Sequence, residues 1–136
     1  GSCFPVLFCF FLWNESQPPA RLVESPQELA ELLQPLCAAG VDVFDCSEYR
    51  HAEPAFVGNP LTIAAWTRLL TNRPVISGGG TVVNITESVR MVRSGEADLI
   101  AVGRALLADA EWAEKMRLAR ESDIIPYTFR ALSRLY

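Results

Sequence analysis

Two stretches decide the fold of this chain: PVISGGGT at residues 74–81 and DLIAVGR at residues 98–104. Each is a short apolar run that ends in glycine, and a helical pattern follows it. Two such units in tandem are typical of the last strands of a β/α barrel, where they build a phosphate site. Glycine lets backbone N–H groups approach a phosphate, and the following helix presents a positive N-terminus. The sequence therefore predicts parallel strands with an anion site at their carboxyl ends.

The rest of the chain alternates strand and helix in the same way, which indicates a parallel α/β fold. Capping boxes at Ser25–Glu28 and Asn84–Glu87 predict two helix starts, and Asn59 is a candidate cap for another. Gly40 and Gly95 are expected to end helices. The expected strands are residues 5–12, 41–46, 74–77 and 99–102, and the expected helices are 26–39, 61–70, 84–95, 103–108 and 110–120, before a tail of helical spacing at 124–136.

These elements make four β/α units, and eight units close a barrel. We therefore predict an α/β fold that is half of a TIM-type β/α barrel. A chain of 136 residues fits one domain, so a single half-barrel domain is expected over residues 1–136, with Gly1 and Ser2 as an expression scar.

The composition excludes several classes of partner and site. The net charge is −4, no basic patch stands out, and neither nucleic acid nor an anionic membrane surface is expected to bind. The apolar run at residues 3–13 is too short to span a bilayer and has no positively charged segment before it, so we expect a cytoplasmic protein. The four cysteines and the single histidine show no metal-ligand spacing, so no metal site is expected.

The loop after the second expected strand carries several polar side chains. Tyr49, Arg50 and Glu53 would lie at the carboxyl ends of the strands, where barrel active sites gather, although a salt-bridged loop without ligand is the simpler interpretation. His51 is expected to be a solvated loop residue, and Cys46 a packed thiol because no base is placed beside it.

Four segments in order resemble the Old Yellow Enzyme family of NADH:flavin oxidoreductases, which are FMN-containing β/α barrels that reduce activated alkenes. The resemblance covers strands five to eight of the family barrel, and it begins at Pro5. The segments that carry it are PLCAAGVDVFDCS at residues 35–47, EPAF at 53–56, DLIAVGRALLAD at 98–109 and PYTFRALSRLY at 126–136.

The resemblance implies where a cofactor phosphate would lie. In the family the FMN phosphate is held after strands seven and eight, which places this role on Gly79, Gly80, Gly103 and Arg104. Backbone donors and one guanidinium can satisfy the oxygens of a phosphate, and arginine can do so bidentately. Two alternatives stay open at this point: the glycines form only a tight turn, or Arg104 pairs with a surface carboxylate such as Asp109 instead of a ligand.

The departures from the family pattern are as informative as the matches. Strand five of the family usually reads Arg-Phe-Ser-Gln-Trp, and its arginine contacts the flavin ring; here Cys9 takes that position, and Phe11 and Leu12 replace two polar residues. The paired substrate donors of strand four have no counterpart in this sequence. No catalytic residue is therefore assigned.

Three functions compete at this stage: an oligomeric, non-catalytic scaffold or interaction protein, an FMN- or phosphate-ligand-binding remnant, and an oxidoreductase that needs a partner with the front half of the barrel. An open four-stranded sheet leaves two edges and one apolar face uncovered. We therefore expect a homodimer or higher homo-oligomer, most simply a two-fold dimer that closes an eight-stranded barrel.

Overall fold

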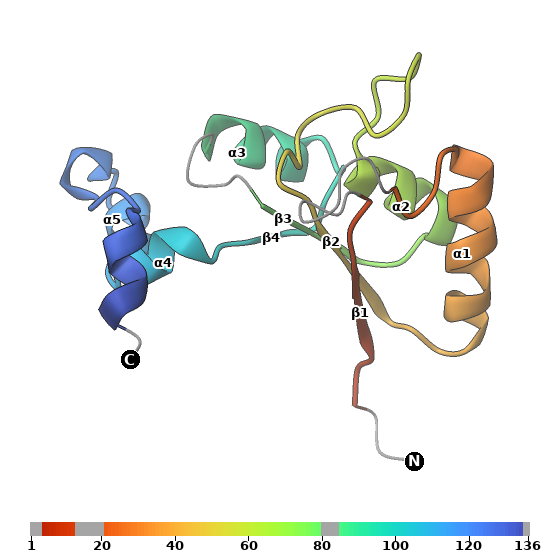
Figure 1. The fold of residues 1–136 in the computed structure, drawn as a ribbon, viewed down its shortest axis with the longest axis horizontal. Helices are drawn as coiled ribbons and strands as arrows, with labels where there is room; N and C mark the ends of the chain where they lie inside the picture. Colours follow the sequence, from red (N-terminus) through yellow and green to blue (C-terminus); the bar gives the residue numbers. More distant parts are fainter. Residues whose placement is uncertain (1–3, 13–20, 80–84, 135–136) are drawn as a thin grey trace.

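The computed structural model describes residues 4–12, 21–79 and 85–134, and in them four parallel strands form one sheet in the order β1-β2-β3-β4. The strands are β1 (Leu7–Phe10), β2 (Val43–Ser47), β3 (Val75–Gly78) and β4 (Leu99–Ala101). Consecutive strands are neighbours, as in a β/α barrel. The predicted α/β half barrel is therefore confirmed, and Figure 1 shows the twisted sheet with its helices.

Three helices follow the first three strands: α1 (Pro26–Ala38), α2 (Ile63–Thr71) and α3 (Ile85–Arg93). Ser25 caps α1 as predicted, because its hydroxyl accepts the Glu28 N–H at 3.2 Å. Gly40 follows the end of α1 with φ of +100°, a conformation that favours glycine. The predicted cap Asn84 lies outside the described residues.

The start of α2 differs from the prediction. Its cap is Thr62, whose hydroxyl accepts the Ala65 N–H at 3.2 Å. Asn59 instead accepts the Leu61 N–H at 2.9 Å and stabilises the turn before the helix. Both residue types can cap a helix, so the choice depends on where the chain turns into the helix, which the local sequence does not fix.

One face of the sheet packs against helices, and among the described residues the other face is more exposed. Alternate strand residues, among them Phe10, Phe44, Cys46 and Val75, pack with the apolar side chains of α1 and α2 in the core. The intervening residues are more exposed. In one register row across all four strands, Cys9, Asp45, Ile76 and Leu99 lie side by side. We call the face that carries this row the open face.

The carboxyl-terminal part of the chain forms a separate cluster of short helices beyond β4 (Figure 1). The cluster contains α4 (Arg104–Ala108), α5 (Trp112–Arg117) and two 3₁₀ helices, η1 (Glu121–Asp123) and η2 (Phe129–Arg134). The predicted helix over 110–120 is thus shorter than expected. Within the cluster, the buried Asp109 carboxylate bonds to the Lys115 ammonium at 2.7 Å and to the Ile125 N–H at 2.9 Å.

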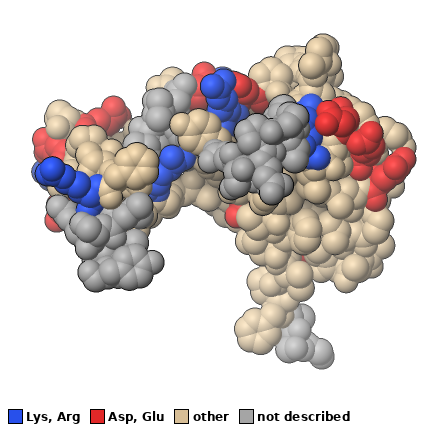
Figure 2. All heavy atoms as spheres, in the orientation of Figure 1, with Lys and Arg blue, Asp and Glu red and all other residues tan. Residues whose placement is uncertain are grey.

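No helix among residues 4–12, 21–79 and 85–134 is long and apolar enough to cross a membrane. On the face shown in Figure 2, the surface near β1 carries few charged side chains. More of them lie along the α3 side and over the carboxyl-terminal cluster.

Candidate functional site at the carboxyl edge of the sheet

Gly79 lies immediately after β3 and is held against the backbone that follows β2. Its φ is +108°, and a Cβ placed on it would lie 1.4 Å from the Glu48 carbonyl oxygen and 3.2 Å from the Tyr49 nitrogen. The Glu48 N–H donates to the Gly78 carbonyl at 2.8 Å, so the two chain segments continue the pairing of the sheet. Only glycine fits this position, and the reason is the close approach of protein backbone.

Arg104 lies beyond the next strand, as the first residue of α4. Its guanidinium carbon is 5.5 Å from the centre of the Tyr49 ring, which is a cation–π distance. The alternative pairing of Arg104 with Asp109 is wrong, because Asp109 bonds to Lys115 and to backbone N–H groups. Arg104 thus lies over the ring of Tyr49, and Tyr49 directly follows the Glu48 carbonyl against which Gly79 packs.

The other two predicted site residues have different outcomes. Gly103 caps α4 with φ of −110° and is exposed, and no heavy atom lies within 4 Å of a Cβ placed on it. Packing therefore does not require a glycine at position 103. Gly80 lies outside the described residues, so its predicted role is untested.

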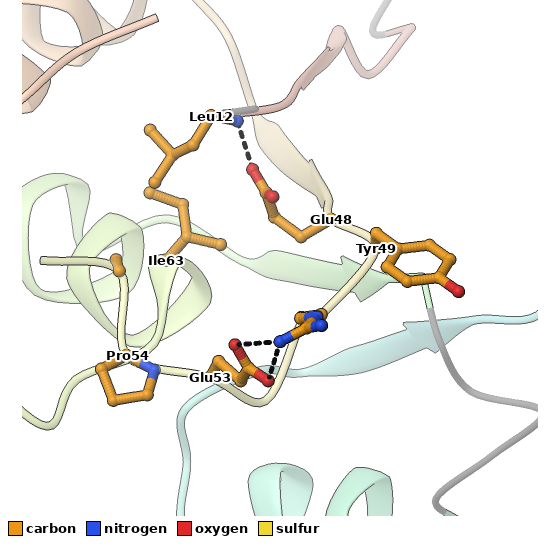
Figure 3. A pocket seen from close by; sticks show the side chains of 8 residues that line it. Leu12, Glu48, Tyr49, Glu53, Pro54 and Ile63 are labelled. Atoms are coloured by element: carbon orange, nitrogen blue, oxygen red, sulfur yellow. Dashed lines mark hydrogen bonds and ion pairs between the residues drawn. The ribbon is translucent and has the colours of Figure 1, made fainter. Parts of the chain in front are cut away.

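A pocket of about 360 Å³ lies beside this corner, between the ends of β1 and β2 and the start of α2. Its walls combine apolar Leu12 and Ile63 with polar Glu48, Arg50 and Glu53. Arg50 and Glu53 form the predicted salt bridge, at 3.1 Å. Figure 3 shows the Glu48 carboxylate pointing toward Leu12, whose backbone N–H it accepts, while the Tyr49 ring points the opposite way.

Glu48 was not singled out from the sequence. Its side chain is buried and joins the end of β1 to the end of β2. A carboxylate that directly follows a buried strand is a signal that could have identified it, because the neighbouring strand leaves backbone donors at the same edge.

The expectation that His51 is a solvated loop residue is wrong. His51 is 3% exposed, and its Nδ1 lies 3.1 Å from the Ser77 hydroxyl of β3. Burial lowers the pKa of the imidazole below its usual 6.5, although the nearby Glu87 carboxylate opposes this shift. His51 thus links the loop after β2 to β3 through the Ser77 hydroxyl. The composition of the loop alone does not predict this contact, because its partner is 26 residues away.

The surroundings of Cys46 and Cys9, both in the described strands, disfavour the thiolate form. Cys46 is fully buried beside the Thr67 hydroxyl at 3.4 Å, and burial raises the pKa of its thiol to about 12. Partial burial and the Asp45 carboxylate raise the pKa of the Cys9 thiol. No group of three or more histidine, cysteine or acidic side chains in the described part of the chain is arranged to hold a metal ion.

On the open face, one Asp45 carboxylate oxygen is buried and has no hydrogen-bond partner among the described atoms. Its carboxylate lies next to Gly78, since a Cβ placed on that glycine would be 3.7 Å from Oδ1. A buried carboxylate oxygen without a partner is rare in folded proteins.

Known proteins resemble this chain in sequence and in fold. The chain is 28% identical over 133 residues to an NADH oxidase of Thermoanaerobacter brockii, a match that covers 91% of this chain and 20% of that protein. The structure superposes on morphinone reductase with a TM-score of 0.57 at 19% identity, covering 84% of this chain and 29% of the other. No family model matches the sequence.

The chain spans about a fifth of the length of the curated relative that it matches. The likeness to morphinone reductase shows the fold, that of a TIM barrel of which this chain forms a part. The sequence match adds a relationship to oxidoreductases. The chain is therefore similar to part of an Old Yellow Enzyme-like NADH:flavin oxidoreductase, as the sequence predicted.

Proposed function

We propose that this chain is a half-barrel domain that binds the phosphate end of FMN in an oxidoreductase of this type, and that it is catalytically incomplete by itself. The observation that carries the proposal is the Arg104 guanidinium, which is exposed and lies over the Tyr49 ring at the carboxyl edge of the sheet. Phosphate sites of β/α barrels are built at this edge, after the last two strands.

The residues present fit a phosphate group. Gly103 and Arg104 are both exposed at the start of α4, and the Arg104 guanidinium lies over the Tyr49 ring. The Arg104 guanidinium would pair with phosphate oxygens, and backbone N–H groups near Gly103 would supply further donors. Bound FMN would supply hydride transfer between a nicotinamide and an acceptor. Cys9, on the open face, provides no cation for the flavin ring.

The test is a titration of the purified chain with FMN, followed by flavin fluorescence, and a parallel titration with riboflavin, which lacks the phosphate. We expect saturable FMN binding that is tighter than riboflavin binding. Arg104→Ala should weaken FMN binding by about tenfold or more, as expected for a lost hydrogen bond to a charged group. Arg73→Ala is the matched control, because Arg73 is an exposed arginine just before β3, at the opposite edge of the sheet. Equal affinity for FMN and riboflavin would refute the proposal.

A second candidate function, an oligomeric scaffold, is favoured by the open face. Leu7 is 50% exposed and Leu99 is 61% exposed, on the two edge strands of the sheet. Both edges are parallel strands, so a two-fold axis along the barrel would set β4 of one copy beside β1 of the other. Eight strands would then close into a barrel.

Sedimentation velocity at micromolar concentration tests this candidate. We expect a dimer that Leu99→Glu converts to monomer, because a carboxylate would be buried in the new interface. Leu69→Glu is the matched control, since Leu69 is 66% exposed on the outer side of α2. A monomeric unmodified chain would refute the scaffold proposal and leave the FMN proposal unaffected.

A further inference from the structure

The segment that carries Tyr49 is anchored on both sides. The Glu48 N–H donates to the Gly78 carbonyl of β3 at 2.8 Å, and the Glu48 carboxylate accepts the Leu12 N–H that follows β1. The side chain of Glu48 is buried, and Gly79 packs directly against its carbonyl. The backbone at Tyr49 therefore has little freedom to move, although its ring is 57% exposed.

Among the described residues, the Arg104 side chain contacts the anchored Tyr49 ring. Arg104 begins a helix of five residues, and its guanidinium carbon is 5.5 Å from the Tyr49 ring centre. Stacking uses the flat face of a guanidinium, whereas its N–H donors point outward in the plane. An arginine held over a ring in this way would keep its bidentate edge available for an anion.

We infer that Tyr49 is a positioning residue that holds the Arg104 guanidinium in place for a phosphate monoester. This inference rests on the proposed FMN-phosphate function and deepens it. A long side chain such as that of Arg104 loses less conformational freedom on binding a phosphate if a neighbouring ring already holds it in place. The phosphate then binds more tightly. The aromatic ring, rather than the phenolic hydroxyl, has this role, because the ring lies beneath the guanidinium.

The test is a double-mutant cycle on FMN affinity, with Tyr49→Leu, Tyr49→Phe, Arg104→Ala and the double variant Tyr49→Leu/Arg104→Ala. We expect Tyr49→Leu to weaken FMN binding by about two- to fivefold, the range of an exposed cation–π contact. Tyr49→Phe keeps the aromatic ring, so it should bind FMN as tightly as the unmodified chain does. In the Arg104→Ala background, Tyr49→Leu should have no further effect, and riboflavin affinity should not respond to either variant. Because Tyr49 is exposed, circular dichroism should show all four variants folded.

A second measurement reports the contact without any ligand. The side-chain proton resonances of Arg104 should shift upfield under the ring current, and this shift should vanish in Tyr49→Leu and persist in Tyr49→Phe. Inorganic phosphate then serves as a competitor of FMN, which separates phosphate recognition from binding of the flavin ring.

The outcomes distinguish the two proposals. If FMN binds with the expected dependence on Arg104 but Tyr49→Leu leaves its affinity unchanged, only the role of Tyr49 is refuted. An equal loss in the presence and absence of Arg104 would also refute it, since Tyr49 would then act through another group. If the unmodified chain does not prefer FMN to riboflavin, the proposed function itself fails, and the role of Tyr49 fails with it.

Discussion

Replacing Gly79 by alanine tests whether this glycine is required by the fold rather than by a ligand. A Cβ at this position would lie 1.4 Å from the Glu48 carbonyl oxygen and 2.4 Å from the Glu48 carbonyl carbon. Both atoms are backbone, so no side-chain rotation can relieve the overlap. The two segments must separate, which breaks the 2.8 Å hydrogen bond from the Glu48 N–H to the Gly78 carbonyl.

The expected loss follows from these contributions. A positive φ costs a residue with a Cβ about 1–2 kcal/mol, and the broken backbone hydrogen bond costs about 1 kcal/mol more. The overlap adds to both, so we expect Gly79→Ala to lower the free energy of unfolding by about 3 kcal/mol or more, a large share of a total of roughly 5–15 kcal/mol.

Urea unfolding followed by circular dichroism, without flavin, measures this loss. The matched control is Gly95→Ala, because Gly95 also has a positive φ of +77° but no atom lies within 4 Å of its Cβ position. The control should lose about 1 kcal/mol. If the two variants lose the same free energy, the packing of Gly79 against Glu48 is not what requires a glycine there.

Three further predictions follow from single contacts. Burial lowers the pKa of His51 in the folded chain, so the unfolded chain binds more protons as the pH falls below 6.5. The free energy of unfolding should therefore be highest above pH 6.5 and should fall as the pH drops through 6.5. Urea unfolding at about pH 7.5 and 5.5 checks this, and His51→Gln should show a smaller difference. Hydrogen bonds from Lys115 and from backbone lower the pKa of Asp109, so Lys115→Met should raise it and shift acid destabilisation to higher pH, whereas Lys115→Arg should not. An NMR titration of the Asp109 carboxyl carbon would contradict this if the two variants titrate alike. Thr62→Ala should lower the free energy of unfolding by about 1–2 kcal/mol, because α2 loses its cap. Thr62→Ser keeps a capping hydroxyl, so most of the stability should remain in the same urea assay.

The strands and most helix starts could be predicted because their signals are local. Ser25 and Glu28 are three residues apart, and the capping bond between them forms as expected. The apolar run before Gly78 becomes a buried strand for the same reason. The cap of α2 was misassigned, because Asn59 and Thr62 offer similar local chemistry and the path of the loop selects between them.

The candidate site was predictable only in outline. Gly79, Gly103 and Arg104 follow consecutive strands, so their common edge follows from parallel topology. The ring beneath Arg104 belongs to Tyr49, which follows β2, so the contact joins residues that are far apart in the sequence. The burial of His51 likewise depends on Ser77, 26 residues away.

By itself, the sequence determined the parallel α/β class, the half-barrel extent and the glycines at the strand ends, because strand and helix periodicity and turn chemistry are encoded within a few residues. The tertiary structure alone decided that Gly79 is constrained by Glu48, that Arg104 lies over the Tyr49 ring rather than pairing with Asp109, and that Asp45 lies on the open face beside Cys9 and Ile76. These are contacts between distant segments, and they are fixed by the register of the strands and the packing of the loops between them.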